Sequence, residues 1–188
     1  MAFKTLQNTI ESLLKKDSPF LYLATISKDQ KPSVRCIVFR YFGINSLLFV
    51  TDIRSQKVNH ILSNQHAEIA WYFYNQRIQL RIPCVCSLLV SPNHSLGNSN
   101  SKAVVIDEEI RLKLWNEISP STRAQYSWPN PMPNNESSES KVYKDTLLIG
   151  DAECAEALNN FVVLVAKPTE YEYLDLNVSP LMPITSTL

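Results

Sequence analysis

Glycine is scarce in this sequence: Gly43, Gly97 and Gly150 are its only glycines in 188 residues. The turns that cradle phosphate in G-x-G-x-x-G motifs and P-loops need several glycines close together, so both motifs are excluded. A phosphate bound by this chain must therefore be held by side chains and by the end of a helix.

Cysteine and histidine are also few. The sequence has four cysteines and three histidines, and Cys84 and Cys86 are the one pair of cysteines close in sequence. Their C-x-C spacing on a predicted strand places both side chains on one face, and it is not the spacing of a zinc knuckle. We expect no metal site and reduced thiols, as is typical of intracellular proteins.

Neither sign of charge is in excess. Lys and Arg together number 18, as do Asp and Glu, so the formal net charge is zero. Bulk attraction to nucleic acid or to an anionic membrane is therefore not expected, although a local patch could bind an anion. The first residues, MAFKTLQNTIESLLKK, contain no apolar core long enough for a signal peptide or a membrane span. We expect a cytoplasmic protein, with a nuclear presence left open.

Short apolar runs alternate with turns along the chain. Helical spacing is found at 5–16, 55–64, 107–118 and 151–160, and strand patterns at 20–27, 33–42, 46–51, 67–74, 77–90, 161–168 and 170–176. At least six strands, mostly joined as hairpins, predict a mainly β antiparallel barrel with α decorations, in one domain spanning 1–188. The polar stretches 91–101 and 130–141 are expected to be flexible loops.

The stretch TDIRSQK (51–57) leads from a strand into a helix. Ser55 is positioned to cap that helix and Lys57 lies in its first turn, where a cation is unfavourable by a few tenths of a kcal/mol to about one. An anion bound at the helix end would offset that cost, and Arg54 adds a second cation. The alternative is a capped helix with solvated cations.

Two further strands carry polar residues within apolar patterns. Arg35 and Arg40 interrupt SVRCIVFRYF (33–42), on opposite faces unless a bulge intervenes. A buried Arg must reach a carboxylate, a phosphate or solvent, so these two either bind an anion or extend to the sheet margins. In RIQLRI, Gln79 lies between Arg77 and Arg81 on one face. That face either reads the edge of a heterocycle or faces water.

The aromatic stretch RAQYSWPNP (123–131) allows two interpretations as well. Trp115 and Trp128 are either core or interface residues, or platforms for a stacked ring. No Ser-His or Cys-His arrangement and no paired carboxylates outside helix surfaces indicate a catalytic group. If the protein is an enzyme, a cofactor is expected to supply the chemistry.

Four segments in chain order carry a family resemblance: RCIVFR (35–40), FVTDIRSQK (49–57), RIQLR (77–81) and WNEISPSTRAQYSWPNP (115–131). Together they resemble the pyridoxamine 5'-phosphate oxidase-like FMN-binding split-barrel family over residues 5–176. The resemblance implies a six-stranded antiparallel split β-barrel. It also implies a homodimer with FMN at the subunit interface.

The resemblance assigns cofactor-binding roles to two groups of residues. Those implied near the phosphate are Arg35 and Lys57, with Ser55 and Gln56 at the helix end and Thr51 beside the ribityl-phosphate. Those implied near the isoalloxazine ring are Arg40 and, through their backbone, Cys36, Ile37 and Val38. Gln79 would reach the cofactor from a barrel strand, with the partner chain as a candidate source, and Trp128 would be a cofactor-side aromatic. No catalytic residue is assigned.

The sequence departs from the oxidases of the family in three places. They have Arg and Lys where this chain has Gln56 and Lys57, with Arg54 as the candidate to compensate. Their Tyr, Arg and Ser for the B6 phosphate have no clean counterparts in LKLWNEISPSTR (112–123), and no Arg or His follows Arg123 to match their C-terminal substrate elements. FMN binding therefore follows more directly from the resemblance than oxidation of B6 phosphates.

Two functions are consistent with the sequence. The first is an FMN-dependent oxidoreductase resembling pyridoxamine/pyridoxine 5'-phosphate oxidase. The alternative is a non-catalytic module on the same fold that binds or stores flavin or haem, with His60 or His66 as the histidine offered to a haem.

Overall fold

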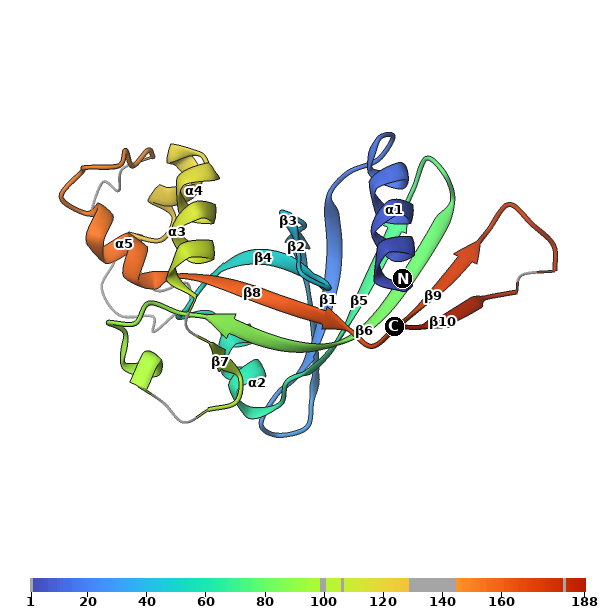
Figure 1. The fold of residues 1–188 in the computed structure, drawn as a ribbon, viewed down its shortest axis with the longest axis horizontal. Helices are drawn as coiled ribbons and strands as arrows, with labels where there is room; N and C mark the ends of the chain where they lie inside the picture. Colours follow the sequence, from blue (N-terminus) through green and yellow to red (C-terminus); the bar gives the residue numbers. More distant parts are fainter. Residues whose placement is uncertain (1, 99–100, 106, 129–144, 181) are drawn as a thin grey trace. The chain divides into compact units, whose positions relative to one another are not determined.

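The computed structural model describes residues 2–98, 101–105, 107–128, 145–180 and 182–188 (Figure 1). Its contacts group the chain into two compact units. The first unit contains Met1–Phe49, His60–Ser87 and Val165–Leu188, and the second contains Val50–Asn59 and Leu88–Leu164. The single-domain organisation expected from the sequence stays a prediction.

Strands dominate the described residues. They are β1 (Phe20–Ile26), β2 (Pro32–Val38), β3 (Tyr41–Gly43), β4 (Ser46–Asp52), β5 (His66–Phe73), β6 (Ile78–Leu89), β7 (Val104–Val105), β8 (Phe161–Pro168), β9 (Glu170–Asp175) and β10 (Ile184–Thr187). They form one sheet in the order β2-β1-β5-β6-β8-β4-β3, with β9 and β7 also on β6 and β10 on β9. The β6–β7 pair is parallel, and hairpin pairs such as β1–β2 and β5–β6 are antiparallel. The expectation of a mainly β antiparallel fold with α decorations is confirmed.

Alternation of burial explains the sheet of the first unit. In β1, Leu21 and Leu23 are fully buried whereas Phe20 and Tyr22 are exposed, as period-two side-chain geometry requires. Helix α1 (Ala2–Leu14) buries Leu6, Ile10 and Leu13 at helical spacing. The Leu13 carbonyl accepts a hydrogen bond from Gln76 Nε2 at 2.9 Å, which joins α1 to the β5–β6 turn (Figure 1).

The second unit contains the helices α3 (Glu108–Glu117), α4 (Pro120–Ala124) and α5 (Cys154–Asn160). Asp107 caps α3 by accepting from the Ile110 amide at 3.1 Å, and an acidic first turn follows it. The rings of Trp115, Tyr126 and Phe161 meet edge to face with centroids 5.2–5.9 Å apart. The core interpretation of Trp115 is therefore confirmed.

One predicted strand is two strands in the structure. Residues 33–42 divide into β2 and β3, because the chain changes partner between them: the Phe39 amide donates to Pro19 O and the Arg40 amide donates to Leu48 O. The prediction that Arg35 and Arg40 lie on one continuous strand is wrong.

Helix α2 (Gln56–Ser63) confirms the helix expected at 55–64. The sequence patterns did not predict α4, β7 or β10, nor the short 3-10 helix at Ser95–Asn98 within the expected loop 91–101. The other expected loop, 130–141, lies outside the described residues.

The cysteines differ in their surroundings. Cys84 and Cys86 are both buried on β6 with their sulfurs 3.8 Å apart, which confirms that they share one face. The hydrogen bond between the Cys84 and Cys86 thiols, and secondly burial, raise the pKa of the Cys84 thiol well above its ordinary value. Cys36 on β2 is exposed.

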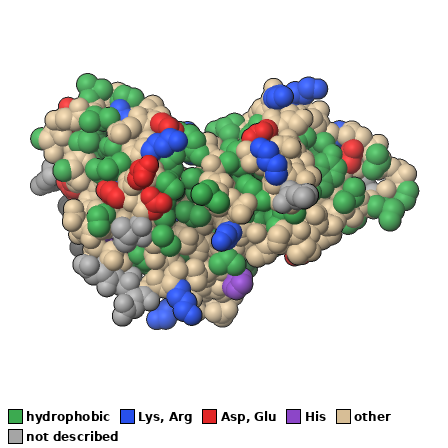
Figure 2. All heavy atoms as spheres, viewed as in Figure 1, with side chains coloured by type: hydrophobic (Ala, Val, Ile, Leu, Met, Phe, Trp, Pro, Cys, Tyr) green, Lys and Arg blue, Asp and Glu red, His purple; other side chains and the backbone are tan. Residues whose placement is uncertain are grey.

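The surface drawn in Figure 2 carries scattered Lys and Arg side chains between apolar and acidic ones. Within the described ranges, no helix combines the length and the hydropathy that crossing a bilayer requires. The same residues contain no cluster of three or more His, Cys, Asp or Glu side chains placed to hold a metal ion.

Candidate functional site

Arg35 is held in place by neutral groups. Its Nη1 donates to the Leu23 carbonyl at 3.0 Å and to Thr25 Oγ1 at 2.7 Å, and its Nη2 donates to Ser33 Oγ at 2.8 Å. Among the described residues no carboxylate forms an ion pair with it. Burial lowers the pKa of the guanidinium, which still remains charged because an Arg does not deprotonate in proteins. An oriented cation without an anionic partner is suited to an anionic ligand.

Thr25 links Arg35 to His60. The Thr25 hydroxyl, in a residue only 1% exposed, lies 2.9 Å from His60 Nδ1 on α2. Burial, and secondly the Arg35 charge, lower the pKa of His60, so its imidazole is neutral at pH 7. The sequence reasoning missed Thr25, Ser33 and His60 as neighbours of Arg35. The available signal was weak: Thr25 and Ser33 are polar residues that face each other in the β1–β2 register.

The loop between β4 and α2 places three of the predicted phosphate residues together. Lys57 Nζ donates to Thr51 Oγ1 at 2.9 Å, and Thr51 Oγ1 lies 3.3 Å from Ser55 Oγ. The Ser55 hydroxyl also lies 2.7 Å from the Asp52 carbonyl, to which it donates. In the described contacts it does not accept from an α2 amide, so the predicted side-chain cap is wrong. Gln56 is exposed at the first position of α2.

Arg54 has a structural role. Its guanidinium forms a two-point ion pair with Asp52, at 2.9 and 2.6 Å, and donates to the carbonyls of Trp128 at 2.8 Å and Tyr126 at 3.4 Å. The hydrogen bond to Asp52 is the largest cause of the raised pKa of Arg54. Four of its five N–H groups are occupied within the second unit. The suggestion that Arg54 compensates for the Arg found in the oxidases stays a prediction.

Arg40 follows β2 and is half-buried. Its Nε is buried and has no hydrogen-bond partner among the described residues. A buried donor without an acceptor is costly, and an acceptor on a bound ligand would satisfy it. Just before it, Cys36, Ile37 and Val38 pair with β1 along one edge. β2 is the terminal strand of the sheet order, and no described strand pairs with its second edge, which suits that edge to a ligand or a partner.

Gln79 and Arg35 lie on opposite faces of the first unit's sheet. The register Arg35–Leu23–Ile69–Ile82 defines the buried face. The register Cys36–Tyr22–Ala70–Arg81 defines the other, and Gln79, two residues from Arg81, shares it. We call this second face the outer face.

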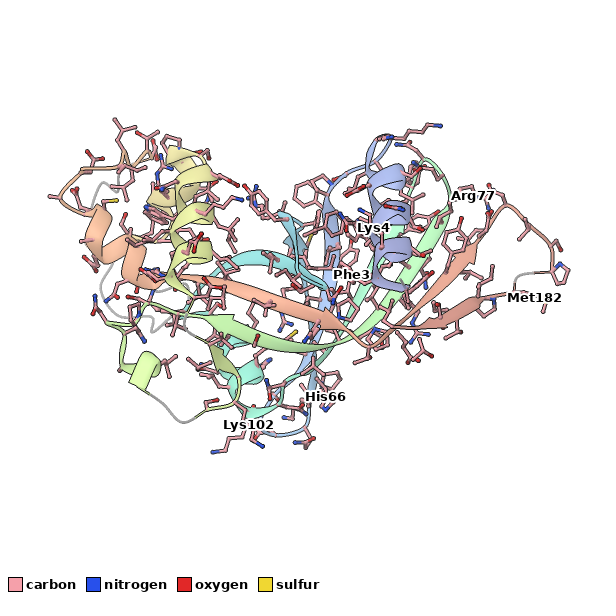
Figure 3. The ribbon with its side chains drawn as sticks, viewed as in Figure 1. Phe3, Lys4, His66, Arg77, Lys102 and Met182 are labelled. Atoms are coloured by element: carbon pink, nitrogen blue, oxygen red, sulfur yellow. The ribbon has the colours of Figure 1, made fainter. Side chains whose placement is uncertain are left out.

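The predicted grouping of Arg77, Gln79 and Arg81 holds only in part. Arg77 lies in the turn before β6 with φ of 56°, at the end of the β5–β6 hairpin in Figure 3. Arg81 is on the strand and pairs with Glu68 at 2.8 Å and Glu172 at 3.6 Å.

The remaining buried arginines of the second unit do not offer a substrate site. Arg111 pairs with Glu108 at 2.7 Å and donates to Leu158 O and Phe161 O. Arg123 donates to the carbonyls of Leu147, Ile118 and Trp115. Both side chains hold backbone carbonyls that would otherwise be buried without a donor.

The site residues predicted from the sequence divide between the units. Arg35, the residues at 36–38, Arg40 and Gln79 lie in the first, whereas Thr51, Ser55, Gln56, Lys57 and Trp128 lie in the second. The expectation that residues of both units contact one FMN stays a prediction. The half-buried Trp128 is joined to the β4–α2 loop through its carbonyl, and its role beside a cofactor also stays a prediction.

Residues 2–89 match the family model described as pyridoxamine 5'-phosphate oxidase, FMN-binding domain. The resemblance to the pyridoxamine 5'-phosphate oxidase-like family is confirmed. Within that family, pyridoxine/pyridoxamine 5'-phosphate oxidase 2 of Arabidopsis thaliana is 28% identical over 166 residues, which are 86% of this chain and 76% of the relative. A pyridoxine/pyridoxamine 5'-phosphate oxidase of Rhizobium leguminosarum is 33% identical over 60 residues, 32% of this chain and 29% of the relative.

Two solved structures share the fold. A pyridoxamine 5'-phosphate oxidase-related, FMN binding protein of Nostoc punctiforme superposes with a TM-score of 0.72 at 25% identity, covering 96% of this chain and 95% of its own. PhzG of Burkholderia lata superposes with a TM-score of 0.65 at 17% identity, covering 100% and 92%. The split-barrel fold expected from the resemblance is therefore confirmed.

Proposed function

We propose that this protein is an FMN-binding flavoprotein and an oxidoreductase. The observation that carries the proposal is Arg35, a half-buried cation oriented by three neutral acceptors and paired with no carboxylate among the described residues. Five N–H groups belong to a guanidinium and three hydrogen bonds occupy this one, so N–H groups remain for a phosphate. A bound FMN would supply hydride-transfer chemistry, and the protein would bind and orient it.

The residues named by the resemblance fit an FMN of this kind. We assign Arg35 and Lys57 each to the phosphate, with Thr51, Ser55 and Gln56 near the first turn of α2, where backbone amides favour an anion. The buried Nε of Arg40 supports a role near the ring, because that atom has no acceptor within the described protein. The free edge of β2 supports backbone contacts from 36–38 to the ring, and Trp128 is assigned as a cofactor-side aromatic.

The first experiment is the visible spectrum of the purified protein, with mass identification of what co-purifies. We expect flavin maxima and the mass of FMN. A Soret band would indicate that the bound group is haem and not FMN. A colourless preparation that takes up no added FMN would overturn the proposal.

The second experiment compares two flavins. Arg35→Ala and Lys57→Ala should each weaken FMN binding by about 1.5–3 kcal/mol, roughly 10- to 150-fold, if each makes charge-assisted phosphate bonds. Riboflavin lacks the phosphate, so its affinity should be unchanged by both. Lys31→Ala and Lys113→Ala remove exposed cations, one in each unit, and serve as matched controls. Equal losses for both flavins would indicate damage to the fold instead of a phosphate contact.

A homodimer with cofactor at its interface is part of the proposal, and the outer face supports it. Phe20, Tyr22 and Val34 on this face are 58%, 54% and 63% exposed, which is unusual for apolar side chains on neighbouring strands. Gln79 lies on this face and Arg35 on the opposite one, so a flat cofactor touching both is most simply shared between two copies of the chain. Gln79 is then assigned to the FMN of the partner chain.

Mixed dimers test the shared site. In a twofold dimer, Arg35→Ala alone and Gln79→Ala alone weaken both sites. Mixing the two variants after dissociation should restore about one site in four to wild-type affinity, because each mixed dimer has one site with neither substitution. No restoration in dimers that demonstrably exchange subunits would place both residues in the same copy.

Pyridoxamine/pyridoxine 5'-phosphate oxidation is the named candidate activity, and turnover of those two substrates is its assay. The alternative is a non-catalytic module that binds or stores flavin or haem. It is favoured by Arg123, which donates to backbone carbonyls and lies in the segment 112–123, where the resemblance to the oxidases implies substrate-phosphate residues. FMN-loaded protein without turnover would leave a flavoprotein and exclude these substrates.

A cytoplasmic location also belongs to the proposal. Cys36, Cys84, Cys86 and Cys154 are all free thiols, as is usual in a reducing compartment. Cell fractionation with an antibody to the full chain is the measurement, and recovery in a secreted fraction would contradict it.

A further inference from the structure

In the first unit, the Thr25 hydroxyl links the Arg35 guanidinium to the His60 imidazole. Thr25 Oγ1 accepts from Arg35 Nη1 at 2.7 Å and is 2.9 Å from His60 Nδ1. These three residues come from β2, β1 and α2, and Arg35 and His60 lie 25 positions apart in sequence while sharing this one oxygen. His60 is half-buried, so it is neither an ordinary surface histidine nor a core one.

The hydrogen-bond chain accommodates both protonation states of His60. When the imidazole is neutral, Nδ1 can accept the Thr25 hydroxyl proton while the Thr25 oxygen accepts from Arg35. When it is protonated, Nδ1–H can donate to the same oxygen, whose two lone pairs allow both donors. The other ring nitrogen, Nε2, makes no hydrogen bond in the described contacts, so its N–H is then a cationic donor open to a ligand.

In the protein without an anion, the environment opposes protonation of His60. Burial and the charge of Arg35 both lower its pKa, and Lys57 lies one helical turn earlier on α2 with the same sign of charge. On β5, His66 and Glu68 line a cavity of about 290 Å³ together with Thr25, but the Glu68 carboxylate is already paired with Arg81 at 2.8 Å. The described surroundings therefore give His60 no carboxylate that would stabilise its proton.

A phosphate dianion bound at Arg35 reverses this balance, because its charge offsets that of the guanidinium. We propose that His60 takes up a proton from solvent when the phosphate group of FMN binds at Arg35, and that the protonated ring is a second donor for that phosphate. This inference rests on the proposed function. It adds a pH-dependent affinity for FMN that is absent for riboflavin.

Calorimetry counts the proton directly. Flavin-free protein is titrated with FMN at pH 7.5 in two buffers that differ in ionisation enthalpy, and the difference in heat gives the protons exchanged. We expect an uptake on the order of half a proton per FMN and none with riboflavin. The phosphate itself, with a second pKa of about 6, is almost fully ionised at that pH and contributes little.

Two histidine variants isolate the group. His60→Asn keeps an amide that can bond Thr25 and removes the titration, so proton uptake should vanish while FMN still binds. His66→Asn removes the exposed histidine beside the same cavity and should leave uptake unchanged. Wild-type affinity for FMN should rise about threefold to tenfold from pH 8.5 to pH 6.5, and that of His60→Asn should be flat.

These measurements distinguish failure of the His60 role from failure of FMN binding itself. FMN binding without proton uptake, or uptake that persists in His60→Asn, overturns the role of His60 and leaves the flavoprotein standing. Absence of FMN binding by the wild type overturns both. If His60→Asn does not fold, His60→Gln and the NMR titration of the His60 ring in the wild type, with and without FMN, give the same decision.

Discussion

The arginines of the two units differ in what they bind. In the second unit, Arg54 and Arg111 each pair with a carboxylate and also donate to backbone carbonyls. In the first, Arg35 has only neutral partners among the described residues. Burial alone does not separate Arg54 from Arg35, because both are half-buried, whereas Arg111 is fully buried. Among these three, the kind of partner separates the arginines that stabilise the fold from the one that is prepared for an anion. Arg123 also has only neutral partners, and what distinguishes it from Arg35 is its deep burial, with 6% of the residue exposed.

The largest effect is expected at Arg111. Replacing it by Met removes a cation that is 1% exposed and leaves Glu108, Leu158 O and Phe161 O without their donor. The free energy of unfolding should fall by about 3–5 kcal/mol, measured by urea denaturation. Lys113→Met on the exposed side of the same helix should change it by less than about 0.5 kcal/mol. An equal loss of unfolding free energy in Arg111→Met and Lys113→Met would contradict a structural role for Arg111.

Arg54→Met should have the next largest effect. It leaves Asp52, whose side chain is 15% exposed, without its ion pair and frees the carbonyls of Tyr126 and Trp128. We expect a loss of about 2–3 kcal/mol in unfolding free energy. A variant with full stability but reduced FMN affinity would instead indicate that Arg54 contacts the cofactor.

Arg35→Lys tests whether the arginine of the first unit serves FMN binding more than stability. Lysine keeps the charge but not the planar fork that reaches Leu23 O, Thr25 and Ser33 together. FMN affinity should fall about threefold to tenfold, less than for Arg35→Ala, with a change in urea midpoint smaller than for either variant above. A loss of stability as large as that of Arg111→Met would make Arg35 structural.

The smallest effect concerns pH and flavin-free protein. Because the pKa of His60 is lowered in the folded state, the unfolded chain binds the proton more readily. Stability from this group is fully present above the unfolded pKa of about 6.5 and is lost as pH falls through it toward the folded value. The melting temperature should therefore drop more between pH 8 and pH 5 for wild type than for His60→Asn. A steeper drop in the variant would contradict the direction of the shift.

Local sequence patterns predict many of the helices and strands of this fold. The alternation in β1, the helical spacing of Leu6, Ile10 and Leu13, and Asp107 before an acidic turn are all readable within a few residues. The break at Phe39 was not readable, because it depends on β2 pairing with β1 and β3 with β4. Pairing between distant segments is what a window of sequence does not contain.

The candidate site follows the same rule. Lys57 bonding Thr51 joins residues six apart and was expected as a group. The role of Arg54 depends on carbonyls more than seventy residues away, and the link from Thr25 to His60 spans 35 positions. Residue types therefore indicated an anion site, whereas the choice among its cations required the fold.

The reaction rate of the buried thiols Cys84 and Cys86 reports how often the sheet around β6 opens. Their thiols are shielded and the pKa of Cys84 is raised, so an alkylating reagent reaches them only when β6 is transiently released. Cys36 is exposed on the terminal strand of a single copy, so its rapid reaction is expected only where neither FMN nor a partner chain covers β2. Cys154 is half-buried and should react before the buried pair, so the two slowest of the four additions report on Cys84 and Cys86. Mass spectrometry of those two additions, with and without FMN, would measure how far the cofactor suppresses opening of the sheet.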